Sequence, residues 1–110
     1  MPRPKTETCM KHALCPKLEA ALQILSKKWS GLIIHALMDG PKRYKDIAEF
    51  IPGISDRMLS ERFKELEEAG IVIRHVYPEV PVRIEYELTE KGKHMDKILE
   101  EISHWAEEFC

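Results

Sequence analysis

Residues 55–88 constrain the fold more than any other part of the chain. A Ser-capped amphipathic segment at residues 55–69 ends at a glycine, and two β-rich runs follow at once. These runs are Ile71–Tyr77 and Arg83–Leu88, and Pro78-Glu79-Val80-Pro81 joins them. Ile71 and Ile73 alternate with Val72 and Arg74, and Ile84, Tyr86 and Leu88 alternate with Glu85 and Glu87, as expected for strands. The segment therefore predicts a helix followed directly by a short β-hairpin.

Two further helices are expected near the start of the chain. Pro16 suits the first position of a helix over about 16–28, because its missing N–H costs nothing there. Apolar residues then recur with helical spacing at Leu18, Leu22, Leu25 and Trp29. A second helix from Ser30 to Met38 is apolar nearly all round, so we expect it in the core, with His35 as a core histidine.

The middle of the chain supplies the partner of the helix at 55–69. Lys42-Arg43-Tyr44 predicts a short edge strand, residues 45–51 predict a third helix, and Pro52-Gly53 makes the turn after it. The buried stripe of the next helix is predicted to be Leu59, Phe63 and Leu66. Two short helices that meet through a glycine-containing turn form a helix-turn-helix, and the hairpin adds a wing. We therefore expect an α+β, mainly α, winged helix-turn-helix whose second helix enters the major groove of DNA.

The last helix is predicted at about 90–109, with Thr89 as its cap. Its apolar residues are spaced three and four apart, at Met95, Ile98, Ile102, Trp105 and Phe109. So narrow a stripe is typical of helices that pack on helices, whereas single-domain cores usually need a broader face. We interpret it as a dimer seam rather than as packing within the chain, and place Leu18 and Leu22 in the same interface.

Several polar residues of the helix at 55–69 are suited to contact DNA. The candidates for contact with bases are Ser55, Asp56, Arg57, Ser60 and Glu61. Arg57 is best suited to a bidentate contact with guanine, although it could instead pair with Glu61, four residues on. The candidates for contact with phosphates are Lys42, Arg43, Lys45 and Lys64, and Arg83 is the candidate on the wing.

The charge distribution agrees with this interpretation better than the total charge does. A net charge of −2 argues weakly against binding to nucleic acid, because nonspecific affinity for DNA is mostly phosphate electrostatics. Residues 40–64, however, carry six basic side chains against four acidic ones, while residues 90–110 carry three against six. The basic surplus thus surrounds the helix at 55–69, which we call the reader helix because it is predicted to contact the bases. The acidic surplus lies away from it.

Composition narrows the class of protein. A chain of 110 residues that is 44% hydrophobic and 33% charged suits one folded domain, which we place at residues 15–110 after a polar tail at 1–14. No apolar run is long enough to span a bilayer and no signal peptide is recognisable, so we expect a cytoplasmic protein with no membrane partner. Phosphate-binding loops, dinucleotide fingerprints, H-E-x-x-H and nucleophile elbows are all missing, which predicts neither an enzyme nor a cofactor.

Cysteine is the residue type in this chain that is best suited to covalent or metal-binding chemistry. A reducing cytosol disfavours structural disulfides, so the odd count of three points to free thiols, metal ligands or redox chemistry. Cys15 occupies the position before Pro16, where the helix dipole and neighbouring Lys17 favour the thiolate; alternatively it is a small, partly buried residue at the helix entry. Cys9, His12 and Cys15 also have a spacing that resembles part of a soft-metal site, with Cys110 as a fourth ligand, although we predict no metal.

An ordered series of motifs resembles the HxlR-type winged-helix regulators, relatives of the MarR group, and especially the quinone- and electrophile-sensing repressors of Bacillus. The resemblance covers about residues 15–110. The motifs that carry it are Cys15-Pro16, Lys28-Trp29-Ser30-Gly31-Leu32-Ile33-Ile34, Asp39-Gly40-Pro41-Lys42-Arg43-Tyr44, Ile51-Pro52-Gly53-Ile54-Ser55 with Met58-Leu59, Leu66-Glu67 before Gly70-Ile71-Val72, and Glu85-Tyr86-Glu87-Leu88-Thr89 with Gly92.

Membership of that family would imply a homodimer, joined through its terminal helices, that binds a palindromic operator in double-stranded DNA. The resemblance also implies a redox-sensing role for Cys15. Trp105-Ala106-Glu107-Glu108-Phe109-Cys110 matches a family segment whose cysteine bridges to the partner's sensing cysteine, so Cys110 inherits that role as a hypothesis. Cys9 remains an alternative partner.

The sequence therefore predicts a repressor that releases DNA when Cys15 is oxidised or alkylated by a small electrophile or oxidant. A covalent tie at Cys15 would shift the first helix and so change the spacing of the two reader helices. Two other functions stay open at this point. One is a metal-responsive regulator built on Cys9, His12 and Cys15, and the other is a winged-helix interaction module without DNA contact.

Overall fold

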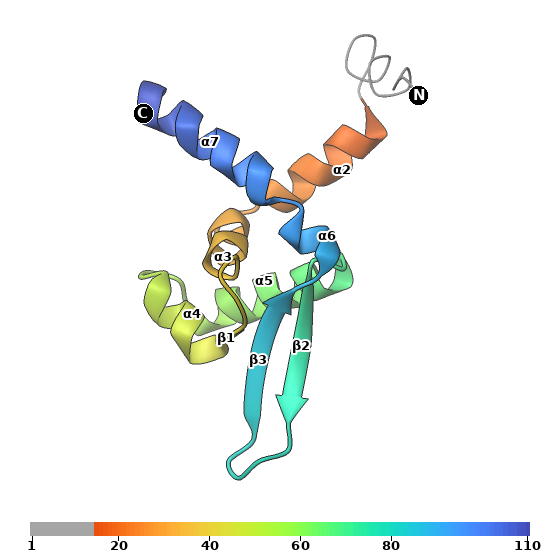
Figure 1. The fold of residues 1–110 in the computed structure, drawn as a ribbon, viewed down its shortest axis with the longest axis vertical. Helices are drawn as coiled ribbons and strands as arrows, with labels where there is room; N and C mark the ends of the chain where they lie inside the picture. Colours follow the sequence, from red (N-terminus) through yellow and green to blue (C-terminus); the bar gives the residue numbers. More distant parts are fainter. Residues whose placement is uncertain (1–14) are drawn as a thin grey trace.

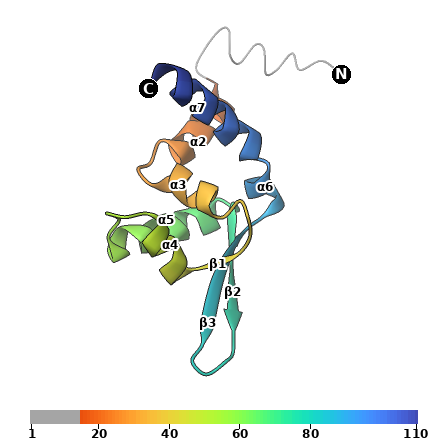
Figure 2. The ribbon, with the colours of Figure 1, turned by 60° about the vertical axis from the view of Figure 1, so that its left-hand side comes forward.

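The computed structural model describes residues 15–110; the predicted tail, 1–14, lies outside the described residues. In chain order the elements are α2 (Pro16–Leu25), α3 (Ser30–Ala36), β1 (Lys42–Arg43), α4 (Tyr44–Phe50), α5 (Asp56–Glu68), β2 (Val72–Tyr77), β3 (Arg83–Leu88), α6 (Glu90–Lys93) and α7 (Asp96–Phe109). Helices α3, α4 and α5 and the base of the sheet form a body. The hairpin extends from one end of it, and α2 and α7 diverge from the other (Figure 1). A second view shows the same division (Figure 2).

The sheet is antiparallel with the strand order β1-β3-β2. Lys42 pairs with Tyr86, and Tyr77 with Arg83 beside the hairpin tip. The predicted edge strand is thus confirmed at Lys42 and Arg43, while Tyr44 already begins α4. The predicted hairpin is confirmed as well, although β2 begins at Val72 rather than at Ile71. The wing is therefore a two-stranded ribbon whose base is broadened by β1.

The core ties α5 to α3, α4 and the base of the wing. The predicted stripe of α5 is confirmed, since Leu59, Phe63 and Leu66 are all buried. Phe63 stacks on Tyr86 of β3, with ring centroids 3.8 Å apart and planes inclined by 11°. Burial also raises the pKa of the Tyr86 hydroxyl. Because one ring of α5 lies flat on one ring of the sheet, the reader helix and the wing share a common anchor.

Two of the predicted helices at the start of the chain differ from those observed. The first ends at Leu25 rather than at 28, and Trp29, whose backbone has φ 83°, separates it from the next helix. The second runs from Ser30 to Ala36 rather than to Met38, and it is not buried all round: Leu32 is 50% exposed. His35 is exposed too, so its prediction as a core histidine was wrong.

The predicted last helix is divided in two. A tight turn at His94 and Met95 separates the two parts. In it the Met95 N–H donates to the carbonyl oxygen of Gly92, three residues earlier, rather than to that of the fourth residue back as in an α-helix. Before this turn α6 lies against the base of the wing, and after it α7 leaves the body. Met95 packs against the core, so it differs from the other four residues of the predicted seam. Within residues 15–110 no helix is long and apolar enough to cross a membrane.

Candidate nucleic-acid interface and thiol site

The turn between α4 and α5 sets the start of the reader helix. Gly53 lies in this turn with φ 96°, a conformation that L side chains rarely adopt. Ser55 then caps α5 as predicted, since its Oγ accepts a hydrogen bond from the Met58 N–H at 3.1 Å. The cap satisfies one of the unpaired N–H groups at the helix start and holds the first turn of α5 at the surface.

Tyr44 fixes the angle between the two helices, a role that the sequence analysis missed. Its hydroxyl donates to the carbonyl oxygen of Asp56 at 2.8 Å and lies 3.2 Å from Ser60 Oγ. Ser60, predicted as a candidate for base contact, is therefore also engaged with α4. The signal in the sequence is an aromatic residue with a polar tip directly before the helix predicted at 45–51, although the pattern Lys42-Arg43-Tyr44 predicts an edge strand there.

All five predicted base-contact candidates are exposed on α5 or at its cap. Arg57, the basic residue among them, has 89% of its side chain exposed. Its Nε lies 3.6 Å from Glu61 Oε2, so the alternative pairing considered from the sequence is present as a loose surface pair. Such a pair contributes little free energy, and the Arg57 guanidinium remains able to bind another acceptor.

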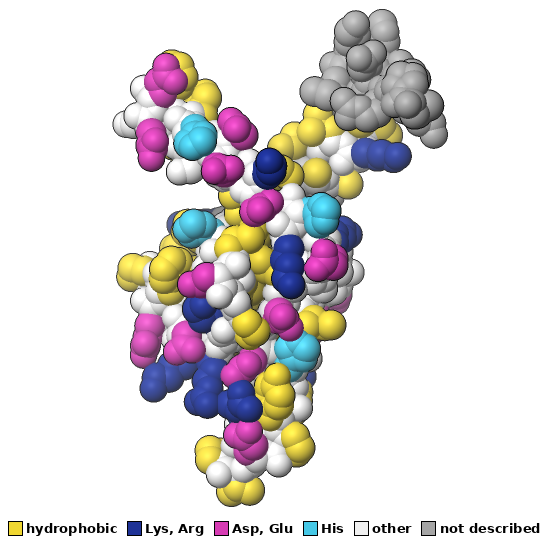
Figure 3. Space-filling view, in the orientation of Figure 1, with side chains coloured by type: hydrophobic (Ala, Val, Ile, Leu, Met, Phe, Trp, Pro, Cys, Tyr) yellow, Lys and Arg dark blue, Asp and Glu magenta, His cyan; other side chains and the backbone are white. Residues whose placement is uncertain are grey.

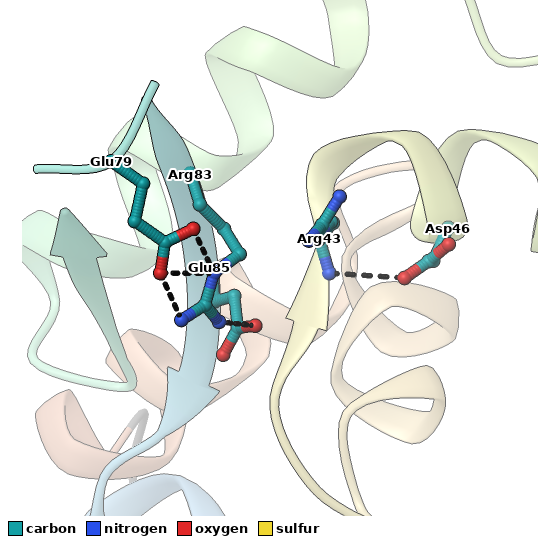
Figure 4. Close-up of polar contacts among 5 residues, drawn as sticks. All are labelled: Arg43, Asp46, Glu79, Arg83 and Glu85. Carbon is teal, nitrogen blue, oxygen red and sulfur yellow. Dashed lines mark hydrogen bonds and ion pairs between the residues drawn. The ribbon is translucent and has the colours of Figure 1, made fainter. Parts of the chain in front are cut away.

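The predicted phosphate-contact residues lie around β1, α4 and α5. Lys45 and Lys64 are exposed, whereas Lys42 Nζ pairs with Asp39 at 2.5 Å and holds the pKa of that carboxyl below its usual range. The backbone N–H of Arg43 donates to Asp46 at 3.3 Å, which leaves its exposed guanidinium outside this cap (Figure 4). Basic side chains gather near α4 and the wing, while acidic ones line the α7 arm (Figure 3).

Arg83, the wing residue predicted to contact DNA, is held within the wing. Its guanidinium donates to Glu79 at 2.8 Å and also to Glu85 (Figure 4). It also lies 4.1 Å from the centroid of the Tyr77 ring. The two carboxylates raise the pKa of Arg83, and the same contact lowers the pKa of Glu79. Arg83 is therefore part of a cluster whose net charge is negative, one guanidinium against two carboxylates, which disfavours its predicted contact with phosphates.

The thiol site lies at the start of α2. Cys15 is the N-cap as predicted: its Sγ accepts a hydrogen bond from the Leu18 N–H at 3.4 Å, and the residue is buried. Cys15 is disulfide-bonded, whereas Cys110 at the end of α7 is an exposed free thiol. Cys9 lies outside the described residues, as does His12, so the metal site considered from the sequence falls there too.

The predicted dimer residues are mostly uncovered. No residue of α2 or α7 is buried within the described part of the chain. The exposed fraction of the apolar side chains on these two arms ranges from 44% to 66%, for Leu18, Leu22, Ile98, Ile102, Trp105 and Phe109. Trp105 and Phe109 touch each other, with ring centroids 5.5 Å apart. Two helices that diverge from the body thus present apolar stripes that the body does not cover.

Comparison with known proteins assigns this architecture to a family. The family model described as HxlR-like helix-turn-helix matches residues 24–110. The chain belongs to this family. The HTH-type transcriptional regulator YodB of Bacillus subtilis is 54% identical to it over 101 residues, which cover 92% of this chain and 90% of YodB. The chain is therefore a transcriptional regulator of the HxlR type, and the family implies DNA binding.

Solved structures of YodB from B. subtilis extend the comparison to three chemical states. The reduced form superposes with a TM-score of 0.80 at 55% identity, covering 89% of this chain and 96% of that one. The diamide-treated form gives 0.75 at 56% identity, covering 90% and 98%. The quinone-bound form gives 0.77 at 51% identity, covering 87% and 100%. The predicted winged helix-turn-helix fold of the HxlR type is thus confirmed.

Proposed function

We propose that the chain is a homodimeric, thiol-based repressor that binds a palindromic operator and releases it when Cys15 is oxidised or alkylated. The observation that carries this proposal is the place of Cys15, whose sulfur caps α2, an exposed helix adjoining the body that holds the reader helix. A covalent change at this sulfur would displace the exposed start of α2 without disrupting the hydrophobic core.

The surroundings of Cys15 support thiol chemistry in the reduced protein. In the disulfide-bonded state seen here its Sγ accepts the Leu18 N–H. In the reduced protein the same N–H and the positive end of the α2 dipole would stabilise a thiolate at this position. YodB, a relative at 54% identity, has been solved with quinone bound and after diamide treatment. By analogy the inducer of this chain is a small electrophile or oxidant.

The two arms support a dimer. A stable protein interface buries about 1,200–2,000 Å² in total, with an apolar centre. The uncovered stripes of α2 and α7, defined by the six residues given above, supply such a centre, and a second copy has matching stripes in the same order. A twofold dimer would also present two α5 helices to a palindromic operator. Sedimentation equilibrium of the reduced protein tests this, and a monomer at micromolar concentration would contradict it.

The experiment that tests the proposed function is a gel shift on the DNA upstream of the gene for this chain. The reduced protein should shift this DNA, diamide should abolish the shift, and dithiothreitol should restore it. A shift that persists in diamide would contradict the thiol switch while leaving DNA binding in place. Absence of a shift on any tiled fragment of the upstream region would contradict the choice of operator and then the regulator itself.

The disulfide partner of Cys15 is decided by two variants. Cys110→Ser removes the exposed thiol at the end of α7, and Cys9→Ser removes the other candidate. If Cys110 of the partner subunit is the resolving thiol, Cys110→Ser abolishes the diamide-induced covalent dimer on a non-reducing gel, while Cys9→Ser retains it. The opposite pattern, in which no covalent dimer forms in either protein and only Cys9→Ser loses the response, assigns the bridge to Cys9.

A further inference from the structure

Residues 26–29, which connect α2 to α3 and are called the joint below, form a strained segment that contacts the helix-turn-helix. Trp29 precedes α3 with φ 83° and no side-chain cap, which is rare for a bulky residue. Its ring lies at the turn between α4 and α5, since a Cβ added at Gly53 would be 3.8 Å from Trp29 Cη2. The joint therefore contacts the turn before the reader helix through the Trp29 ring.

Arg62 of α5 holds this joint directly. Its Nε donates to the carbonyl oxygen of Lys28 at 2.9 Å, and its Nη1 donates to Glu65 Oε1 at 3.0 Å. The other carboxylate oxygen of Glu65 pairs with Lys27 Nζ at 3.1 Å, and the hydrogen bond from Lys27 lowers the pKa of Glu65. Only 13% of the Arg62 side chain is exposed. One guanidinium thus joins the reader helix to the backbone of the joint.

Apart from this bridge, α2 is loosely packed on α5. A cavity of about 170 Å³ lies where α2, the joint, the start of α3 and α5 meet, lined by Ala20, Gln23, Ile24, Lys27, Ser30, Glu65 and Leu66. Of the residues in α2, only Ile24 and Leu25, in its last turn, pack against the core. The end of helix α2 that carries Cys15 therefore has room to move. Such a movement would displace the joint and so act on the hydrogen bonds of Arg62 and Glu65.

We propose that Arg62 is a positioning residue that transmits displacement of α2 to the reader helix through the Lys28 carbonyl and the Glu65–Lys27 pair. This inference rests on the proposed function and gives it a route from Cys15 to α5. An arginine suits this role because its rigid fork serves two acceptors at once, whereas a lysine ammonium lacks that planar geometry. Arg62 thereby leaves the group of basic residues available to DNA, although it counts toward the basic surplus of residues 40–64.

The test compares Arg62→Met and Arg62→Lys with wild type, and Glu65→Gln with Glu68→Gln as its matched control. Glu68 lies on the same helix, is exposed and has no ion pair among the described residues. Each protein is first checked for cooperative thermal unfolding. Its Kd for the upstream DNA is then measured before and after diamide, which takes two electrons and two protons from Cys15 and a second thiol as they form a disulfide. Deuterium exchange of residues 56–68 is followed in both states.

For the proposed coupling, the ratio of the oxidised to the reduced Kd should fall at least about fivefold in Arg62→Met, with a smaller fall in Glu65→Gln and Arg62→Lys. The reduced Kd should stay within about threefold of wild type, and Glu68→Gln should behave as wild type. Deuterium exchange in α5 should respond to diamide in wild type and not in Arg62→Met. A merely structural role would weaken both states equally and leave the ratio unchanged.

Failure of this inference is distinct from failure of the proposed function. If Arg62→Met releases DNA in diamide as wild type does, the coupling role is overturned and the thiol switch stands. If wild type keeps its DNA in diamide, the thiol switch fails. Deuterium exchange of α5 then decides whether a change at Cys15 is transmitted to α5 through Arg62. A response of α5 that is lost in Arg62→Met would support the coupling, and an α5 that does not respond in wild type would overturn it. Should Arg62→Met fail to fold, Arg62→Lys and Glu65→Gln give the same comparison.

Discussion

Arg57 and Arg62 lie on the same helix, yet their surroundings give them different roles. The Arg57 side chain is 89% exposed and loosely paired with Glu61, whereas that of Arg62 is 13% exposed and bound to the Lys28 carbonyl. Helical periodicity could predict the buried stripe of α5, because that pattern is local. It could not separate the two arginines, because the acceptor of Arg62 lies 34 residues away in sequence.

The first prediction concerns Arg57 alone. If Arg57 contacts a guanine, Arg57→Ala should weaken operator binding by about 1–3 kcal/mol, which is roughly 5- to 150-fold in Kd. Thermal stability should change little, because the pair with Glu61 is exposed and loose. Fluorescence anisotropy with labelled operator measures the loss, and Glu68→Gln serves as a control. An unchanged Kd would remove Arg57 from the DNA interface.

At the scale of elements, the division of the last helix is the largest difference from the sequence-based expectation. The part of the stripe from Ile98 to Phe109 is helical as predicted, but Met95 lies in a turn and α6 is a separate short helix against the base of the wing. Thr89 caps it as predicted, because its Oγ1 accepts from the Gly92 N–H at 3.1 Å. Gly92 of α6 is in close contact with the Ile71 carbonyl, a tertiary contact that periodicity does not express.

That contact makes Gly92 the most sensitive glycine in the described fold. An added Cβ would collide with the Ile71 carbonyl oxygen, which is backbone and moves only if β2 moves. Gly92→Ala should therefore lower the free energy of unfolding by about 1–3 kcal/mol in urea titrations. Gly31→Ala is the matched control: nothing lies within 4 Å of its Cβ, and alanine in α3 should stabilise by up to about 1 kcal/mol. Equal effects of the two substitutions would contradict this account.

At the scale of the whole molecule, the chain divides into a body that carries the reader helix and wing and two arms that carry the thiols. Charge follows this division, with basic side chains near α4 and the wing and acidic ones along the α7 arm. The motif series and periodicity were enough to predict the winged fold. They could not predict the positive φ at Trp29 or the bridge from α5 to the joint, because both depend on packing between segments remote in sequence.

The central claim is that Cys15 controls DNA binding by acting on α2. The most direct measurement is the operator Kd of wild type and of Cys15→Ser, each before and after diamide, by fluorescence anisotropy. Serine keeps an N-cap acceptor, so reduced Cys15→Ser should bind within about threefold of wild type. Diamide should raise the wild-type Kd at least about tenfold and leave that of Cys15→Ser unchanged. Release of Cys15→Ser to the same extent as wild type would contradict the account.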